Sequence, residues 1–378
     1  MKTKTLFYSV IVSAFCLLPS TFGQGVLTPP GAPAAGMKSL AQIEPRTPIS
    51  AAPFTISAGG SYYLTTNLTV SAGDAITIAA DNVTLDLNGF TIRSTAASAT
   101  GTGILLNGGL RNLTLANGFI QGGVTNNGSG VYSGGGFANG IYFSGNAPLN
   151  VLASRLSISG CSVYGIYLLN GNSTVVEACA VRTVGGYGIV ASTIKSCAAM
   201  DCGNTAIYGD EVSDSRGQCS GSSSGLYAIT AQNCNGYSGS GSGLVATTAQ
   251  NCYGQSTSGD GLDTTTAQNC YGQSTSSYGL SIGGNALNCY GVSTSGYGLY
   301  AIAAQNCSGY SSGNGDGIYT TTAQNCYGYS GGTGIGLFAS KTASGCYGYC
   351  LSGTGLSAFI ANSCSGTSLN VTHNLNSY

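Results

Sequence analysis

Residues 225–364 repeat one phrase about every 18 or 19 residues. It reads GLYAITAQNCNG from Gly225, GLVATTAQNCYG from Gly243 and GLDTTTAQNCYG from Gly261. Further copies begin at Gly279, Gly298, Gly317, Gly336 and Gly355. A fixed period of this length indicates one small structural unit stacked on copies of itself. The unit is poor in helix formers and has short runs of β-branched or small residues between Gly/Ser-rich bends. The repeat therefore predicts an all-β solenoid whose coils pair strand on strand in parallel.

The stretch NCYGYSGGTGIGL, residues 325–337, is similar to the repeat of the right-handed parallel β-helix family with the pectate lyase-like fold. An Asn, a strand, a Gly-rich turn, Gly-Ile and a second strand follow one another in that family's order. The resemblance covers roughly residues 54–378. It implies a single-stranded right-handed parallel β-helix in a secreted protein of bacterial type. Counting the Gly-Ile and Gly-Leu starts predicts about 14 coils.

Alternate residues of a strand face opposite sides, so the repeat predicts which side chains are buried. One expected buried stack contains Leu226, Leu244, Leu262, Leu280, Leu299, Ile318, Leu337 and Leu356. A second contains Cys234, Cys252, Cys270, Cys289, Cys307, Cys326, Cys346 and Cys364. An Asn precedes six of these cysteines, where we expect left-handed backbone and side-chain hydrogen bonds between coils. A Gly two residues after most of the cysteines points inward and predicts a thin coil there.

The residue that follows each Cys points outward and is Tyr in five copies of the repeat. With one tyrosine from the next outward position, the predicted glycan-binding residues are Tyr253, Tyr271, Tyr290, Tyr327, Tyr329 and Tyr347. Tyr offers an aromatic ring and a hydroxyl, and flanking Gln255 and Gln273 add amides, so this face suits a neutral polysaccharide. The other interpretation is that Tyr favours strands and stacks on its own copies. No other extended aromatic face is expected in the repeats.

Charge is concentrated in residues 177–216, which hold eight of the 23 charged side chains. If the chain is an enzyme, the candidate catalytic residues are Asp210, Glu211, Asp214, Arg216 and Lys195. In the resembled family, lyases combine Ca²⁺-binding acids with an Arg or Lys base, and hydrolases use clustered Asp residues. The resemblance therefore implies a polysaccharide lyase or glycoside hydrolase as the alternative function, with Ca²⁺ as a cofactor only for a lyase. The family's hydrolase motifs are missing, and a loop of solvated charges is the other interpretation.

Several classes of site are disfavoured by composition. Cysteines that recur once per coil favour buried thiols over a disulfide framework, although oxidation of stacked neighbours stays open. Cys197 with Cys202 and Cys346 with Cys350 are local exceptions to the spacing. No CxxC occurs and His373 is the one histidine, so we expect no metal site. The formal charge of −1 and the absence of a basic stripe argue against nucleic acid as a partner.

Residues 1–23 have the pattern of a secretory signal, with Lys2 and Lys4 before an apolar run and cleavage expected before Gln24. Residues 24–50 are Pro-rich and predict a linker with an N-terminal cap, including a short helix over residues 38–43. Residues 51–378 form the expected β-helix domain. No other apolar run is long enough to span a bilayer.

The sequence leads to three functional interpretations. The first is a secreted or surface-displayed monomer without catalytic activity, which contacts polysaccharide or neighbouring surfaces through its Tyr/Gln/Ser face. The second is the enzyme with its site in residues 177–216. The third is a purely structural or adhesive rod.

Overall fold

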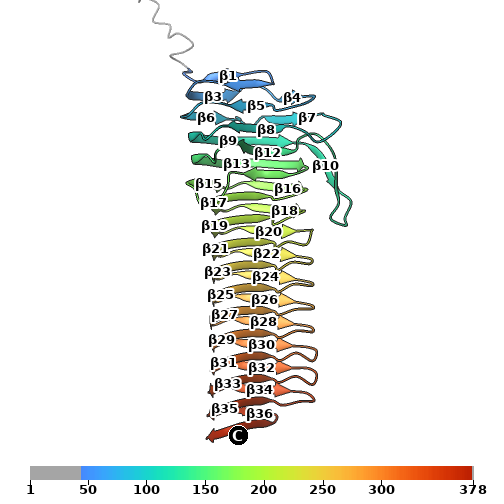
Figure 1. The fold of residues 1–378 in the computed structure, drawn as a ribbon, viewed down its shortest axis with the longest axis vertical. Coiled ribbons are helices and arrows are strands. Elements are labelled where there is room, and N and C mark those ends of the chain that lie inside the picture. Colours follow the sequence, from blue (N-terminus) through green and yellow to red (C-terminus); the bar gives the residue numbers. More distant parts are fainter. Residues whose placement is uncertain (1–43, 377–378) are drawn as a thin grey trace, which may run out of the picture. The chain divides into compact units, whose positions relative to one another are not determined.

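The computed structural model describes residues 44–376. The predicted signal peptide and most of the predicted linker, including the expected helix over residues 38–43, lie outside these residues. Residues 46–376 form a parallel β-solenoid of about 17 turns (Figure 1). The prediction of a parallel β-helix is therefore confirmed. There are more turns than the predicted 14 because the first coils lack the Gly-Ile start that was counted. The first strand begins at Thr47, within the stretch expected to be linker.

Each regular coil presents three faces, which we number in chain order. In the coil that starts at Gly225, face 1 is formed by residues 226–228, face 2 by residues 230–232 and face 3 by residues 235–238. Eleven strands turn from face 1 to face 2: β17 (Ile189–Lys195), β19 (Ile207–Ser213), β21 (Leu226–Gln232), β23 (Leu244–Gln250), β25 (Leu262–Gln268), β27 (Leu280–Leu287), β29 (Leu299–Gln305), β31 (Ile318–Gln324), β33 (Leu337–Ser344), β35 (Leu356–Asn362) and β37 (Leu369–Leu375).

Face 3 is formed by short strands that pair in register from coil to coil. These strands are β4 (Leu68–Val70), β7 (Thr91–Ser94), β16 (Ala180–Val184), β18 (Ala198–Cys202), β20 (Arg216–Cys219), β22 (Asn235–Ser238), β24 (Tyr253–Ser256), β26 (Tyr271–Ser274), β28 (Tyr290–Ser293), β30 (Ser308–Ser311), β32 (Tyr327–Ser330), β34 (Tyr347–Cys350) and β36 (Ser365–Gly366).

The early coils use separate strands for faces 1 and 2. Face 1 holds β2 (Phe54–Ile56), β5 (Ile76–Ile78), β8 (Thr102–Asn107), β12 (Asn139–Ser144) and β14 (Tyr164–Tyr167). Face 2 holds β1 (Thr47–Ile49), β3 (Gly60–Leu64), β6 (Val83–Asp86) and β15 (Thr174–Glu177). Two long strands, β9 (Arg111–Gln121) and β13 (Leu149–Cys161), turn from face 2 to face 3. An antiparallel hairpin, β10 (Gly123–Asn126) with β11 (Tyr132–Gly135), projects from these coils (Figure 1).

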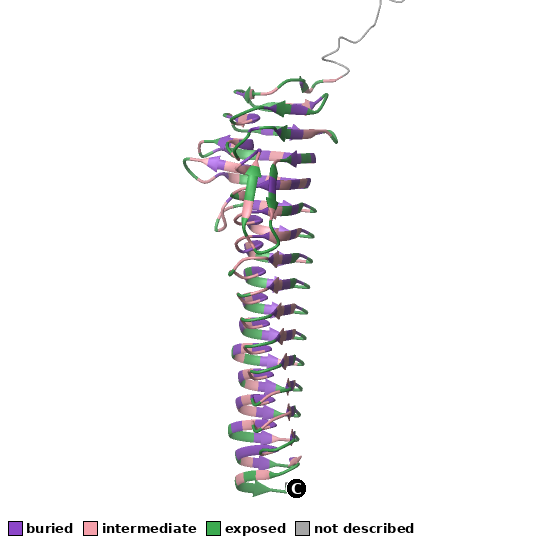
Figure 2. Ribbon diagram, turned by 90° about the vertical axis from the view of Figure 1, so that its right-hand side faces the viewer, coloured by how far each residue is buried: buried purple, intermediate pink, exposed green. Residues whose placement is uncertain are grey.

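The interior is built from stacks of equivalent side chains, and buried positions alternate with exposed ones along the coils (Figure 2). Every member of the predicted Leu/Ile stack has no exposed surface, and every member of the predicted Cys stack is buried. Burying one such Leu contributes about 1.5 to 3 kcal/mol. All 14 cysteines in the described part of the chain are free and buried, including the pairs that broke the spacing.

The predicted Asn ladder lies at the bend between faces 2 and 3. All six asparagines adopt the left-handed backbone, as at Asn269, where φ is 53°. Each side-chain amide from Asn251 onward donates to the carbonyl oxygen of the preceding Asn, with N–O distances from 3.1 Å at Asn251 to 3.4 Å at Asn325. The ladder therefore satisfies exposed polar groups at a bend that few other residues tolerate.

A buried Ser ladder, which the sequence did not suggest, fixes the turn that follows face 3. Ser256 donates to the Gly241 carbonyl at 2.7 Å and accepts from the Gly259 amide at 2.9 Å. The same pattern recurs at Ser238, Ser274, Ser293, Ser311 and Ser330 for the donated bond. Cys350 takes the position of Ser in a later coil, and its thiol bonds the Gly334 carbonyl at 3.0 Å.

No helix that is long and apolar enough to cross a membrane is found within residues 44–376.

The inward Gly of face 3 leads to a first prediction. A Cβ atom on Gly254 would lie 2.0 Å from the Gly261 carbonyl oxygen, so backbone must move to admit it. We expect Gly254→Ala to destabilise the fold by at least about 3 kcal/mol, the upper part of the range for overpacking. Gly239→Ala is the matched control, because a Cβ there meets nothing within 4 Å. Urea unfolding followed by circular dichroism measures the stability of both variants. Equal unfolding midpoints would contradict the close backbone approach at Gly254.

The Cys stack leads to a second prediction. Every thiol of this stack is buried, so an alkylating reagent can reach it only after the coils open. We expect native thiols to resist alkylation and to react after unfolding. Cys270→Ala should cost about 1 to 2 kcal/mol as a small cavity. Cys270→Asp should cost far more, because it buries a charge. Rapid labelling of most thiols in the folded protein would contradict this.

Candidate functional site

The predicted glycan-binding tyrosines all lie on face 3. The first outward position of its strands is occupied in successive coils by Asn235, Tyr253, Tyr271, Tyr290, Ser308, Tyr327 and Tyr347. The second is occupied by Tyr237, Gln255, Gln273, Val292, Tyr310, Tyr329 and Tyr349. Every one of these seven coils therefore carries at least one Tyr on this face, and none of the 14 positions is charged.

The tyrosine rings of face 3 stack on one another along the solenoid. The ring centroids of Tyr253 and Tyr271 are 5.2 Å apart and nearly parallel, and those of Tyr327 and Tyr347 are 5.7 Å apart. Tyr329 lies between Tyr310 at 4.4 Å and Tyr349 at 5.3 Å. A ring with a neighbour on each side has both π-faces covered. On this face Tyr271 and Tyr329 have such contacts on both sides, and they present mainly ring edges and hydroxyls to solvent.

The hydroxyls of this face are neutral hydrogen-bonding groups. Burial raises the pKa of Tyr253, of Tyr271 and of Tyr327 above the ordinary value for a phenol. The Tyr253 hydroxyl donates to the Gln255 side-chain oxygen at 2.8 Å, which links the two outward positions of that coil. Such groups bind hydroxyl-rich ligands without a dependence on charge.

The candidate catalytic residues are spread over different parts of the solenoid. Lys195 and Glu211 point outward from face 2, where Lys195 pairs with Glu177 and Glu211 pairs with Thr193 in the strand register. Asp210 lies at the bend between faces 1 and 2 and accepts hydrogen bonds from the Asn170 side chain at 3.0 Å and the Gly171 amide at 2.7 Å.

Asp214 and Arg216 are the two candidates that the structure brings together. Asp214 occupies the Asn-ladder position in the coil before Asn233 and has the same left-handed backbone, with φ of 49°. Its carboxylate accepts a hydrogen bond from the Asn233 side-chain amide at 3.0 Å. Arg216 begins β20 on face 3 and is exposed. Both line one shallow hollow, which Asp210, Glu211 and Lys195 do not reach. None of the five side chains forms an ion pair with another within the described residues.

Asp201, in the same charged region, has a structural role. Its carboxylate accepts hydrogen bonds from the side chains of Asn126, Tyr132, Thr183 and Ser220. Burial acts to raise the pKa of Asp201, but the four hydrogen bonds outweigh it and hold this pKa below its ordinary value. Asn126 and Tyr132 belong to the β10–β11 hairpin. The carboxylate therefore holds the hairpin against the coils. The residues in contact are 69 to 75 positions apart in the sequence, so no local pattern predicts the contact.

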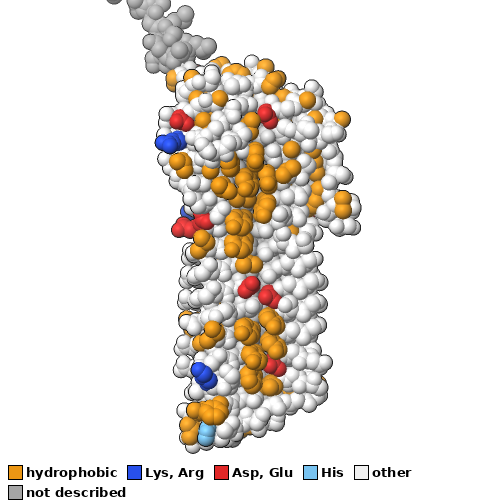
Figure 3. Space-filling model, viewed as in Figure 1, with side chains coloured by type: hydrophobic (Ala, Val, Ile, Leu, Met, Phe, Trp, Pro, Cys, Tyr) orange, Lys and Arg blue, Asp and Glu red, His pale blue; other side chains and the backbone are white. Residues whose placement is uncertain are grey.

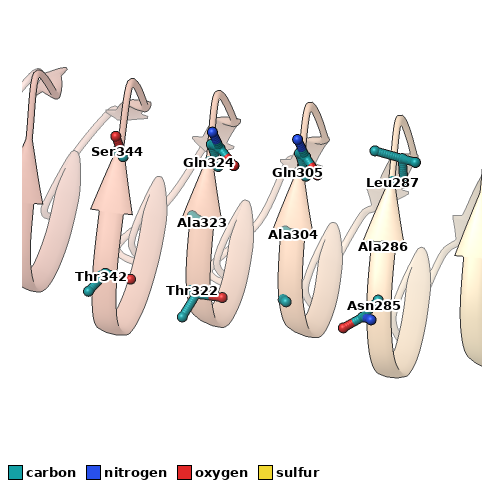
Figure 4. A pocket seen from close by; sticks show the side chains of 11 residues that line it. Asn285, Ala286, Leu287, Ala304, Gln305, Thr322, Ala323, Gln324, Thr342 and Ser344 are labelled. Carbon is teal, nitrogen blue, oxygen red and sulfur yellow. The ribbon is translucent and has the colours of Figure 1, made fainter.

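Face 2 carries a groove that the sequence did not predict (Figure 4). Its volume is about 520 Å³. One edge is formed by Asn285, Thr322 and Thr342, and the other by Leu287, Gln305, Gln324 and Ser344. One extra residue in β27, at 283–284, and one in β33, at 340–341, shift the strand register at the two ends of the groove. The lining is uncharged throughout, so the groove offers hydrogen bonds and no acid–base chemistry.

Face 1 carries a second aromatic surface, and the expectation that the repeats have no other extended aromatic face is wrong. Tyr278, Tyr297, Tyr300, Tyr319 and Phe338 contact one another at 4.8 to 5.9 Å. In earlier coils a further chain of contacts joins Tyr142, Phe143, Tyr164, Tyr167, Tyr187, Tyr208 and Tyr227. The space-filling view shows a hydrophobic stripe of this kind, broken by acidic side chains (Figure 3). The signal was a Tyr beside several of the Gly-Leu and Gly-Ile starts, outside the Asn-Cys phrase on which the prediction was based.

Two acids lie in the coil between these aromatic groups. Asp260 accepts from the Ser277 hydroxyl and the Tyr278 amide. Asp263 points outward from face 1, and burial followed by the charge of Asp260 raises its pKa. No basic side chain of residues 44–376 forms an ion pair with either.

Comparisons with known proteins do not assign the chain to a family. No family model matches the sequence, and no curated protein matches it. Among solved structures, the A-module of the Azotobacter vinelandii mannuronan C-5 epimerase AlgE4 is similar over 84% of this chain and 88% of that one, at 12% sequence identity. The TM-score is 0.29, so this likeness carries no argument.

The Asp201 contacts lead to a third prediction. Removing a carboxylate that accepts four hydrogen bonds leaves those donors without a partner, so Asp201→Ala should cost about 2 to 3 kcal/mol locally. We expect faster amide hydrogen exchange in residues 123–135 while the repeat coils keep their protection. Asp263→Ala is the control, since its carboxylate accepts no hydrogen bond from a described residue. Unchanged exchange in the hairpin of the Asp201 variant would show that other contacts hold it.

Proposed function

We propose that this chain is a secreted, non-catalytic parallel β-helix protein that binds neutral polysaccharide along face 3. One observation supports this most strongly: seven successive coils carry nine tyrosines and no charged side chain at the outward positions of one flat sheet. Tyrosines with a ring that packs and a hydroxyl that stays wet are enriched at binding surfaces. An array of this length suits a polymer better than a small molecule.

The chemistry of face 3 matches a hydroxyl-rich, uncharged ligand. The phenol hydroxyls donate and accept, and the amides of Gln255 and Gln273 do both from fixed positions on neighbouring strands. Three of the tyrosines, Tyr290, Tyr327 and Tyr347, are each about 40% exposed, at 43%, 42% and 40%. A charged polymer would find no counter-charge at these 14 positions, which favours neutral glycans.

The placement of the acids supports a binding role over hydrolysis. Acid–base cleavage of a glycosidic bond requires two carboxyl groups about 5 to 9.5 Å apart on either side of the bond. Asp260, Asp263 and Asp316 are the acids in the coils after Gly217, and they lie on the face 1 side of the coils, away from the tyrosines of face 3. Asp210 lies at the bend between faces 1 and 2, Glu211 lies next to it on face 2, and Asp214 lies at the bend between faces 2 and 3. The enzyme hypothesis therefore depends on Asp214 and Arg216, which share one hollow.

A polysaccharide panel tests this proposal, with binding and product formation measured on the same samples. We expect retention on one or more neutral polymers and no new reducing ends or unsaturated product. Release of product by the wild type, lost in the Asp214→Ala/Arg216→Ala variant, would replace the binding proposal with the enzyme.

The aromatic faces allow a matched test, our fourth prediction. The variant Tyr271→Ala/Tyr290→Ala/Tyr327→Ala removes three rings from face 3 and should weaken binding by at least about tenfold, since each ring contact is worth about 0.5 to 1.5 kcal/mol. The variant Tyr300→Ala/Tyr319→Ala/Phe338→Ala removes three rings from face 1. It should bind as the wild type does in affinity electrophoresis. If the face 1 variant alone lost binding, face 3 would be the wrong surface.

A further inference from the structure

The Tyr ladder of face 3 is interrupted at one coil. Ser308 takes the first outward position there, and it pairs in register with Tyr290 in the preceding coil and Tyr327 in the next. Ring contacts join Tyr271 to Tyr290 at 5.3 Å and Tyr327 to Tyr347 at 5.7 Å. Within residues 44–376 no ring contact spans Ser308. The two tyrosines therefore each keep one face open toward the same gap.

The gap has the depth of one ring. Tyr290 and Tyr327 are two coils apart, and a spacing of about 4.8 Å per coil separates them by about 9.5 Å. A ring held between them needs van der Waals contact at about 3.5 to 4.0 Å on each side, or about 7 to 8 Å in all. One sugar ring therefore fits and two do not. Tyr290 is already inclined by 48° to Tyr271, so it is not locked into the parallel stack.

We propose that the gap at Ser308 is a subsite that holds a single neutral pyranose ring of the polysaccharide between Tyr290 and Tyr327. This rests on the proposed function and adds to it the position at which a sugar ring stacks. A pyranose has C–H faces that pack on aromatic rings and hydroxyls around its edge. The Ser308 hydroxyl makes no hydrogen bond with any described residue, so it is available to a sugar hydroxyl at the floor of the gap.

The surroundings favour this coil over the other places where the ladder ends. At the two ends of the ladder, Tyr253 pairs with Asn235 and Tyr347 pairs with Ser365. Each of these rings has one open face, but no second ring of the ladder lies opposite it. In the second outward position Tyr310 stacks on Tyr329 at 4.4 Å, which leaves it beside the gap and not across it. Val292 adds an apolar wall in the preceding coil. The subsite is thus bounded by two rings, one hydroxyl and no charge.

Ser308→Tyr tests the subsite and is our fifth prediction. It restores the residue that Tyr271, Tyr290 and Tyr327 supply in neighbouring coils, so the fold should accept it and the ladder should close the gap. With cellohexaose, mannohexaose and xylohexaose as probes in isothermal titration calorimetry, the hexaose that the wild type binds should bind at least about tenfold more weakly. Ser308→Ala keeps the gap open and should stay within about threefold of the wild type, the loss of one hydroxyl contact.

The outcomes separate the subsite from the function it rests on. If Ser308→Tyr binds as the wild type does while the triple face 3 variant does not, face 3 binds glycan and the subsite is wrong. If the wild type binds none of the three hexaoses and no neutral polymer in the panel, both proposals are wrong. A thermal unfolding midpoint of Ser308→Tyr at or above that of the wild type shows that weaker binding does not come from misfolding.

Discussion

Hydrogen bonding in register between successive coils is the constraint on which most of this structure depends. The strand of each coil pairs in parallel with the same strand of the next, at about 4.8 Å. A residue type that recurs once per period therefore becomes a continuous column in space. The Asn ladder, the Cys stack, the Ser ladder and the Tyr ladder are four results of this single rule. Each column satisfies its own polar groups or packs its own surface, because its neighbours above and below are copies of itself.

The same constraint leaves no interior space for a binding site. At one edge of the coil, faces 1 and 3 approach so closely that a Cβ on Gly243 would lie 2.3 Å from the Gln255 amide nitrogen. The remaining width is filled by the Leu/Ile and Cys stacks, all buried. Binding in the regular coils must therefore occur on the outer faces. Outward positions can hold different residue types, because they are not constrained by the packing of the interior.

The repeated part could be predicted well from the sequence, because in-register pairing places equivalent residues of successive repeats directly above one another. The repeat predicted that Leu262 and Cys270 are buried and that Asn269 lies at a bend. The equivalent residues of the other coils occupy the same places. The early coils were predicted less well, since loops of unequal length separate their strands. The Asp201 contacts depend on a hairpin that folds back over distant coils, so no spacing in the chain reports them. The aromatic residues of face 1 were missed for a different reason: Tyr278 precedes one Gly-Leu start and Tyr300 follows another, so they do not recur at one fixed position of the repeat.

A perfect ladder also limits what its members can bind. The two faces of Tyr271 are covered by Tyr253 and Tyr290, and the amide of Asn269 is used by its neighbours. Such residues stabilise the solenoid, and a tyrosine stacked on both sides offers a ligand mainly its ring edge and its hydroxyl. Free π-faces, unpaired hydroxyls and local hollows arise where a coil departs from the consensus: at Ser308 on face 3, at the register shifts beside the face 2 groove, and at Asp260 and Asp263 between the aromatic groups of face 1. In a protein built from copies, specificity must reside in the positions that are not copied, because an unbroken repeat offers every ligand the same edge at every coil.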